Sequence, residues 1–350
     1  MIASEKPTNL YNLNLESLKS LLAGWGAPRA QARLVWDYLY CHLVTGFDGM
    51  FELTPAVRER LAAETVIYVP PVLARQEAPG GETRKDLLEL ADGQQVEVVL
   101  LRYGRRRSAC ISTQVGCACG CRFCATGQMG FVRDLTSGEI VAQVLHVQRE
   151  LVEEGEALTN VVLMGMGEPL LNTEQTLAAV RRLVDRRGLA LAPRRVTLST
   201  VGIVPGIRRL MDERLPIKLA VSLHAATDEL RECLVPVNRR YPLAVLFAAL
   251  RDYSARTGRR VMLEWVMVDG VNDTVEQAQA LVDRLAGLPA HVNLIRVNAT
   301  AGYGGRPSSE EAMEAFTAVL DGAGVPHTMR QRRGGAIGAG CGQLRSRRES

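Results

Sequence analysis

The chain has 350 residues, of which 47% are hydrophobic and 23% are charged, and its formal net charge is +4. This near-average composition excludes wholesale disorder and collagen-like repeats. Charge or glycine interrupts every long apolar run before the roughly 18 residues that a membrane-spanning helix needs. The first residues, MIASEKPTNL, lack the apolar core of a secretory signal, so we expect a cytoplasmic protein without membrane contact.

The N-terminal part is predicted to be helical. Apolar residues recur there at helical spacing. The expected helices are Leu15–Trp25, Ala30–Val44 and Pro55–Glu64. Residues 66–105 are instead rich in strand-forming residues, most clearly at Val66–Val69 and Val96–Leu101. We therefore expect a helical domain over residues 1–65 and a strand-rich connecting segment over residues 66–105.

Residues 106–330 alternate between apolar strands and amphipathic helices. The expected strands are Ala109–Thr113, Asn160–Met164, Arg195–Thr200, Ile217–Leu223, Arg260–Val268 and Val292–Asn298. Before the first expected helix, Thr136 and Glu139 have the spacing of a capping box. Six such units indicate an α/β fold, either a complete or partial TIM-like barrel or a doubly wound sheet, which periodicity does not separate. Residues 331–350 form a glycine-rich loop and a basic tail.

Five of the eight cysteines lie within fifteen residues of one another. Cys117, Cys121 and Cys124 form a C-x₃-C-x₂-C pattern, which suits a [4Fe–4S] cluster with one open iron for a substrate. A structural zinc site needs four ligands, usually in two separated pairs, and the sequence has no second pair. Cys119 is an additional thiol, so a pairing of Cys119 with Cys121 stays open.

A cysteine triad after the first of six β/α units resembles the radical S-adenosylmethionine (SAM) superfamily. Three further segments narrow the resemblance: Met164-Gly-Met-Gly-Glu-Pro-Leu-Leu-Asn172, Ser222-Leu-His224 and Ala339-Gly-Cys-Gly-Gln-Leu344. Together they resemble the RlmN/Cfr family of radical SAM RNA adenosine methyltransferases over residues 14 to about 345. The resemblance implies a partial (β/α)₆ barrel, a [4Fe–4S] cluster, SAM bound to the open iron, an RNA substrate, a reductant such as flavodoxin, and a monomer.

The resemblance also implies a set of SAM-binding residues. Gly167 and Glu168 hold the amino group of SAM. The sulfonium, ribose and adenine regions are contacted by Ser199, Ser222, Leu223, His224 and Asn298. Taken singly, several of these residues have simpler interpretations: a tight turn at Gly167, a strand-end hydroxyl at Ser199 and a core histidine at His224.

The implied chemistry uses two more cysteines and a carboxylate. Carbon C2 of adenine has no lone pair to attack a sulfonium methyl, so ordinary displacement fails. By resemblance, Cys341 takes a methyl group from one SAM, a radical derived from a second SAM removes a hydrogen, and the resulting methylene radical adds to the adenine. Cys110 then attacks Cys341 to release the product, and Glu97 is the proton acceptor. A buried structural cysteine at Cys341 and an exposed strand face at Glu97 are the alternatives.

The loop before Cys341 departs from the family pattern. The family usually has a Gly-Asp-Asp-Ile-Asp-type run there, whereas this chain has Gly334-Gly-Ala-Ile-Gly338. Three carboxylates are missing, so we expect a more flexible and less negative loop.

The family methylates either C2 or C8 of one large-subunit rRNA adenosine, and the C2 branch often also modifies a tRNA adenosine beside the anticodon. Residues 165–172 favour C2, whereas residues 200–205, residues 238–242 and Arg296 lean toward C8 relatives, and C2 is our prediction. A radical SAM enzyme with a peptide substrate and a non-catalytic RNA-binding or metal-storage protein are the alternatives.

Arginine groups and aromatic residues are the candidate RNA contacts. Pairs such as Arg181–Arg182 and Arg208–Arg209 either neutralise phosphates or simply solvate the surface. In the second expected helix, Trp36, Tyr38 and Tyr40 either stack on unpaired bases or pack in the core.

Overall fold

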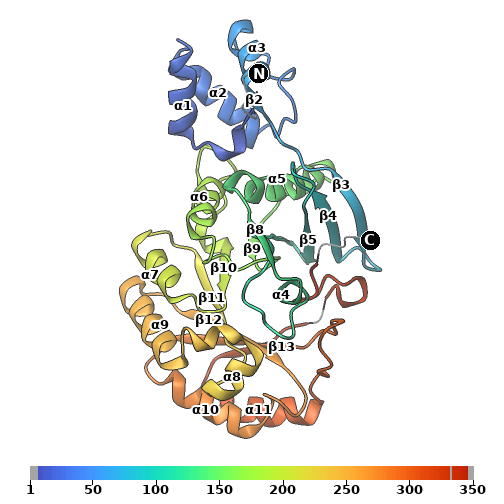
Figure 1. Ribbon diagram of the computed structural model, residues 1–350, viewed down its shortest axis with the longest axis vertical. Coiled ribbons are helices and arrows are strands. Elements are labelled where there is room, and N and C mark those ends of the chain that lie inside the picture. The colour runs from blue at the N-terminus through green and yellow to red at the C-terminus, as the bar shows by residue number, and fades with distance from the viewer. Residues whose placement is uncertain (1–6, 332, 346–350) are drawn as a thin grey trace.

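A ten-stranded sheet organises the protein (Figure 1). The computed structural model describes residues 7–331 and 333–345. Seven neighbouring strands of this sheet run parallel: β6 (Arg106–Cys110), β9 (Asn160–Leu163), β10 (Val196–Thr200), β11 (Lys218–Ser222), β12 (Val261–Met267), β13 (Ala290–Arg296) and β14 (His327–Met329). Six were expected; β14 is a short addition beside β13.

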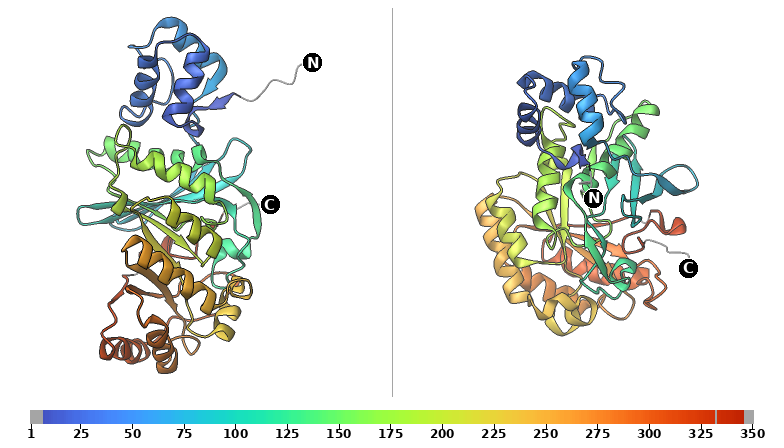
Figure 2. Two further views of the ribbon diagram at one scale, coloured as in Figure 1. Left: turned by 90° about the vertical axis from the view of Figure 1, so that its left-hand side faces the viewer. Right: turned by 45° about the horizontal axis from the view of Figure 1, so that its top comes forward.

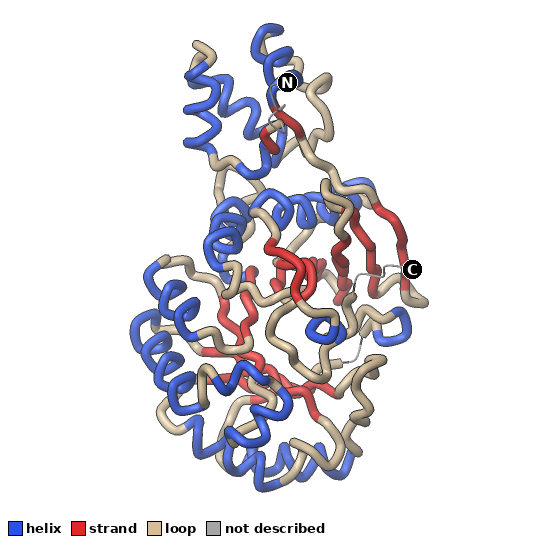
Figure 3. The backbone as a smooth tube through the Cα atoms, viewed as in Figure 1, coloured by secondary structure: helices blue, strands red, loops and turns tan. Residues whose placement is uncertain are grey.

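These parallel strands lie side by side in chain order, and the order never reverses. A doubly wound sheet would show a reversal at its switch point, so the sheet is a barrel wound in one direction. Within the described residues β14 and β3 are its two edges, which makes the barrel partial, as predicted. The helices that follow the strands surround the curved sheet (Figures 2 and 3). They are α5 (Ser137–Glu153), α6 (Thr173–Val184), α7 (Val204–Asp212), α9 (Leu243–Thr257), α10 (Val275–Leu285) and α11 (Glu310–Gly322).

The strand-rich segment belongs to the same sheet. Its strands β3 (Val72–Glu77), β4 (Thr83–Glu89) and β5 (Gln95–Tyr103) pair antiparallel with one another, and β5 pairs antiparallel with β6. The segment thus widens the barrel sheet rather than forming a separate layer. The expected strand Val66–Val69 is reduced to the two-residue β2 (Thr65–Val66), which pairs with β1 (Thr8–Asn9).

The N-terminal helices α1 (Leu15–Gly24), α2 (Arg29–Tyr40) and α3 (Pro55–Glu64) form a unit at one end of the molecule (Figure 1). Their core contains Trp36, Tyr38 and Tyr40, each at most 8% exposed, so these rings fill the interior and are not available for stacking on bases. Two arginines of the barrel hold the unit in place. Arg149 donates to the Tyr11 hydroxyl at 2.6 Å, and Arg182 donates to the Asn12 carbonyl at 2.9 Å.

Several short elements were not expected from the sequence. They are β7 (Gln114–Gly116), α4 (Ala125–Gln128), β8 (Phe131–Asp134), α8 (Asp228–Leu234) and the 3₁₀ turns η1 (Leu10–Asn12), η2 (Pro193–Arg195), η3 (Pro236–Arg239) and η4 (Gly335–Ile337). The predicted capping box of Thr136 and Glu139 is present at the start of α5. No helix in the described part of the chain is both long enough and apolar enough to cross a membrane.

Candidate active site

A cavity with about 1120 Å³ of empty space, open solvent included, lies at the carboxyl ends of the barrel strands. Active sites of barrel enzymes form at this end. The cavity is lined by ten of the residues that the sequence singled out: Cys117, Cys121, Cys124, Gly167, Glu168, Ser199, Ser222, His224, Asn298 and Cys341. Glu97, Cys110 and Leu223 lie outside this lining.

The cysteine loop connects β7 to α4 and is anchored at both sides. The Cys117 amide donates to the Gly130 carbonyl at 2.8 Å, and the Arg122 amide donates to the Leu234 carbonyl of α8 at 3.1 Å. Burial raises the pKa of the Cys121 and Cys124 thiols. Because thiolates are costly in such surroundings, they need a cationic partner, which iron provides.

The spacing of the thiols argues against a single metal ion. Four-coordinate zinc binds sulfur at about 2.3 Å, which places its sulfur ligands within about 4 Å of one another. Among the described residues, no group of three that includes a cysteine brings its ligand atoms within 4.8 Å of one another. Three thiols around one cavity, farther apart than that, suit a larger iron–sulfur group. Cys119 also lines the cavity, and its thiol lowers the pKa of the neighbouring Cys117 thiol.

Gly167 and Glu168 sit in the turn after β9. Gly167 has a φ of +97°, and a Cβ there would lie 2.5 Å from the Gln114 Cβ, so only glycine fits. The Glu168 carboxylate accepts from the Leu170 amide at 2.9 Å and the Val201 amide at 2.8 Å. Burial nevertheless raises its pKa to about 7. A buried carboxylate of this kind suits an ammonium partner.

The sequence left two interpretations of His224 open, a SAM contact and a core histidine, and the structure shows features of both. It lines the cavity, and its Nδ1 accepts from the Val266 amide at 3.0 Å. Its backbone φ of 62° is unusual for a non-glycine residue and marks a locally strained turn. Burial, followed by the charge of Arg231, lowers its pKa to about 3, so the ring is neutral near pH 7.

This neutral ring makes the stability of the protein pH-dependent. The folded-state pKa lies below the ordinary value of 6.5, so the contribution of His224 is present above pH 6.5 and is lost as the pH falls toward 3. We expect the free energy of unfolding to fall by about 1.4 kcal/mol per pH unit more in the wild type than in His224→Gln below pH 6. Denaturant unfolding of both proteins between pH 5 and 7.5 measures this difference, and parallel curves would contradict it.

The loop that carries Cys341 is fastened to the cysteine loop. The Gly342 carbonyl accepts from the Ala125 amide at 2.7 Å, and the Leu344 carbonyl accepts from the Thr126 hydroxyl at 2.6 Å. Asn298 donates to the Cys341 carbonyl at 3.1 Å. Cys341 is exposed on the side that faces the cavity. The cavity walls partly exclude water from its thiol, and this desolvation raises the pKa of the thiol.

Glu97 reaches this loop through Lys85, which the sequence analysis did not single out. Lys85 Nζ lies 2.8 Å from Glu97 Oε1 and donates to the Gly338 carbonyl at 3.2 Å. The other carboxylate oxygen of Glu97 accepts from the Arg345 amide at 2.8 Å. The pair of buried Glu97 and half-buried Lys85 thus holds the chain on both sides of Cys341, in a loop that lacks carboxylates of its own.

We expect Lys85→Met to loosen this loop. Losing a hydrogen bond to a charged group costs about 1.5–3 kcal/mol, so amide exchange of residues 334–345 should quicken about tenfold or more. Hydrogen-exchange mass spectrometry measures this. Lys19→Met, which removes the partner of Glu16 on α1, is the control that should leave the loop unchanged. Equal exchange in all three proteins would show that the Lys85 contact does not hold the loop.

Cys110 ends strand β6. Burial, followed by the charge of Cys341, raises the pKa of its thiol to about 12, so the two thiols lie within electrostatic reach of each other. All eight cysteines are free. Leu223 is fully buried, and its amide donates to the Glu264 carbonyl at 3.0 Å, so its side chain belongs to the core.

Three further charged residues line the cavity, Glu264, Arg296 and Arg330. Glu264 is buried on β12, where it accepts from Asn293 at 2.8 Å, and burial raises its pKa. Arg330 approaches its carboxylate at 3.6 Å. In the sequence, Glu264 could have been noticed because it is the single carboxylate inside an otherwise apolar strand.

Several of the clustered arginines are engaged within the protein. Ion pairs join Arg102 to Glu154, Arg107 to Glu156, Arg181 to Glu213, Arg209 to Glu174 and Arg239 to Glu232. These five side chains are therefore already paired with carboxylates of the protein itself. Arg332 and the tail from residue 346 lie outside the described residues.

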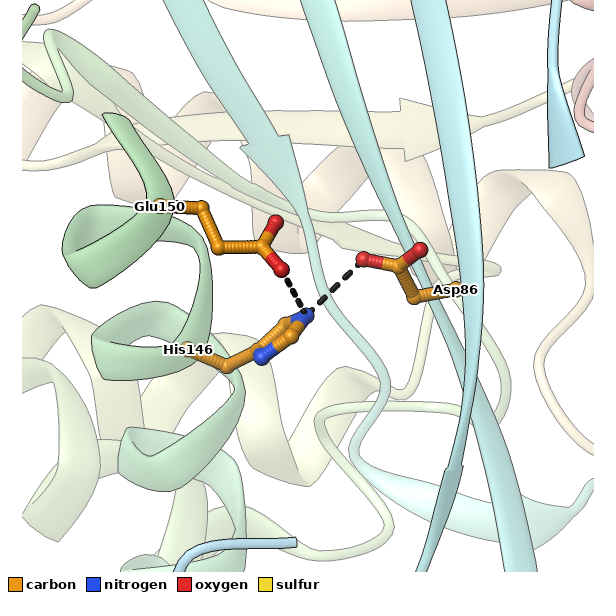
Figure 4. A group of neighbouring side chains, drawn as sticks. All are labelled: Asp86, His146 and Glu150. Atoms are coloured by element: carbon orange, nitrogen blue, oxygen red, sulfur yellow. Dashed lines mark hydrogen bonds and ion pairs between the residues drawn. The ribbon is translucent and has the colours of Figure 1, made fainter. Parts of the chain in front are cut away.

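A second cluster of ionisable groups lies between β4 and α5 (Figure 4). His146 Nε2 lies 2.8 Å from Asp86 and 3.8 Å from Glu150. Arg75 pairs with both carboxylates, and Arg84 pairs with Glu150. Because guanidinium groups already neutralise these carboxylates, the cluster is an ion-pair network that joins the sheet extension to the barrel rather than a metal site.

The partial barrel, the three-cysteine loop and the adjoining cavity define a radical SAM enzyme. Residues 111–283 match the radical SAM superfamily model, and residues 8–67 match the model of the ribosomal RNA large subunit methyltransferase N-terminal domain. The chain is 52% identical over 343 residues to dual-specificity RNA methyltransferase RlmN 1 of Myxococcus xanthus, covering 98% of this chain and 96% of that relative. It is 46% identical to a probable RlmN of Symbiobacterium thermophilum, covering 97% of this chain and 91% of the relative.

The comparison of folds leads to the same class of enzyme as the comparison of sequences. The crystal structure of a radical SAM methyltransferase from Sphaerobacter thermophilus superposes with a TM-score of 0.94 at 46% identity, covering 97% of this chain and 99% of that one. The protein belongs to the RlmN family of radical SAM RNA methyltransferases, whose cofactors are a [4Fe–4S] cluster and SAM.

Proposed function

We propose that the protein methylates C2 of an adenosine in the peptidyl-transferase centre of 23S rRNA, and also a tRNA anticodon-loop adenosine, through a methylated Cys341. Relatives of the chain are named dual-specificity RNA methyltransferases, and this name supports a protein that acts on two RNA substrates. The observation that carries the proposal is the position of Cys341, which shares one cavity with the cysteine triad and Glu168.

In this proposal Cys117, Cys121 and Cys124 hold the cluster, and Glu168 and Gly167 receive the amino group of SAM. When bound, the cluster and SAM supply a methyl group and a hydrogen-abstracting radical. Ser199, Ser222, His224 and Asn298 orient SAM from the strand ends. Leu223 contributes by positioning its neighbours, because its own side chain lies in the core.

The remaining residues handle the adenine and the release of product. Cys341 carries the methyl group to the base, and the fastened loop keeps it beside the cysteine loop. Glu97 accepts the proton from the adenine carbon, which requires it to exchange its contact with the Arg345 amide. Cys110 attacks the sulfur of Cys341 and forms a transient disulfide as the bond between that sulfur and the methylene carbon breaks. The carbon keeps the electron pair, takes up a proton and leaves on the base as its new methyl group.

We also propose the cellular setting. The protein works in the cytoplasm as a monomer and receives electrons from a reductant such as flavodoxin. The unit over residues 1–65 recruits RNA, residues 66–105 and 106–330 carry the sheet and the cavity, and residues 331–350 present Cys341. Exposed Arg29 and Arg33 on α2 supply charges for phosphate contact.

The test is anaerobic methylation of an rRNA fragment and of a tRNA, followed by digestion and mass spectrometry of the nucleosides against standards. The proposal predicts 2-methyladenosine in both RNAs. The appearance of 8-methyladenosine would assign the protein to the C8 branch. Formation of 5′-deoxyadenosine without either product would rule out these substrates.

A further inference from the structure

Arg231 is an unusual feature of the wall behind the cavity. It belongs to α8 and is fully buried, with 0% of its surface exposed. Burying a guanidinium costs several kcal/mol unless its donors and its charge are both matched. Arg231 belongs to none of the sequence motifs, and it does not line the cavity.

The donors of Arg231 are matched by neutral oxygens. Nε donates to the Leu223 carbonyl at 3.1 Å, Nη1 to Asn238 Oδ1 at 2.9 Å, and Nη2 to the carbonyls of Val201 at 2.6 Å and Ser222 at 3.3 Å. These carbonyls lie at the carboxyl ends of β10 and β11. The side chain therefore braces the two strands that carry Ser199 and Ser222.

Two groups near Arg231 can balance its charge, the Asp228 carboxylate and the Cys121 sulfur, which is a thiolate when it holds the cluster. Asp228 is reached through Asn238, which donates to Asp228 Oδ1 at 2.8 Å. The other is Cys121 in the cysteine loop, which is joined to α8 by the bond from Arg122 to Leu234. Burial lowers the pKa of Arg231 to about 10, and the charge of Cys121, ahead of that of Asp228, opposes this shift.

We propose that Arg231 is a positioning residue whose fixed, buried positive charge behind Cys121 sets the reduction potential of the cluster. Potentials of iron–sulfur clusters depend on nearby charge, on hydrogen bonding and on exposure to solvent. When the cluster takes up one electron, its negative charge increases. A guanidinium held in a low-dielectric wall favours that reduced state more strongly than one in water. The inference rests on the cofactors of the family and is independent of the carbon that is methylated.

The experiment measures the reduction potential of the cluster in the wild type and in variants, in the absence of RNA. The wild type, Arg231→Met, Arg231→Lys and Arg182→Met are reconstituted anaerobically and titrated with dithionite, with electron paramagnetic resonance to follow the reduced cluster. Iron and sulfide analysis reports cluster content. Arg182 is the matched control, because it is also a buried arginine that donates to carbonyls, but at the contact with the N-terminal helices.

We expect Arg231→Met to shift the potential to a more negative value, Arg231→Lys to restore most of the shift, and Arg182→Met to leave it unchanged. A purely structural brace would behave differently, since lysine cannot reproduce the four hydrogen bonds but does keep the charge. A wild-type potential in Arg231→Met with full cluster content would overturn the proposal.

Asp228→Asn keeps the proposal testable if Arg231→Met fails to fold. This isosteric change leaves Arg231 in place and removes the carboxylate that partly neutralises it through Asn238. The unopposed guanidinium should then shift the potential to a less negative value. An unchanged or more negative potential in Asp228→Asn would overturn the inference, whatever the outcome for RNA methylation.

Discussion

Replacing Cys341 by alanine should abolish RNA methylation while leaving the cluster intact. In the proposed mechanism Cys341 carries the methyl group, so its loss removes the only covalent route to the base. We expect product formation to fall by more than about 10³-fold, the scale seen when an enzyme loses its nucleophile. Anaerobic methylation assays with mass spectrometry of the nucleosides measure the loss.

Cys233→Ala is the control for this prediction. Cys233 is an exposed cysteine on α8 with no part in the proposed chemistry, so its variant should keep wild-type activity. Iron content and 5′-deoxyadenosine formation in Cys341→Ala should confirm that the cluster still cleaves SAM. Retained methylation in Cys341→Ala would instead point to an enzyme that does not use a methylated cysteine.

Replacing Cys121 by alanine should remove the cluster itself. Cys121 is buried in the wall of the cavity, and three thiolates are the minimum that holds a cube with one open iron. We expect Cys121→Ala to lose nearly all iron, its absorbance near 400 nm and all SAM cleavage. Iron and sulfide analysis after anaerobic reconstitution provides the measurement.

Cys119→Ala tests the alternative that the sequence left open. Cys119 lies in the same loop and is equally buried, yet it falls outside the C-x₃-C-x₂-C spacing. If the triad holds the cluster, Cys119→Ala keeps its iron and Cys121→Ala does not. If only Cys119→Ala lost its iron, Cys119 rather than Cys121 would be the third cluster ligand.

The barrel strands were predictable because each is a short apolar run followed by an amphipathic helix. The expected and observed bounds of β10 and β11 differ by at most one residue at each end. Short elements such as β7, β8 and α8 were not found, since they have too few residues for a period to show. Strands β7 and β8 pair with each other, and α8 is bonded to the cysteine loop through Leu234.

The residues of the candidate site likewise fall into two groups, those that a sequence motif reveals and those that only the structure reveals. The cysteine triad, Glu168 and Cys341 were found from local spacing and resemblance. Lys85, Glu264 and Arg330 belong to no motif, and their importance comes from partners far away in the chain. Lys85, for example, meets Gly338 across 253 positions of sequence separation. Arg231 belongs to no motif either, although its hydrogen-bond partners lie only 7 to 30 positions away. The sequence also left open whether Trp36 and Tyr40 stack on bases or pack inside, and burial decided for the core.

The sequence alone indicated the class of chemistry, because the three proposed cluster ligands lie in one short loop, where their spacing can be read directly. It also determined the alternation of strands and helices, which follows from hydrophobic periodicity. The tertiary structure decided the direction in which the sheet winds, the fastening of the Cys341 loop and the charges around the cavity. These features depend on contacts between distant segments, whose energies arise only when burial brings the segments together.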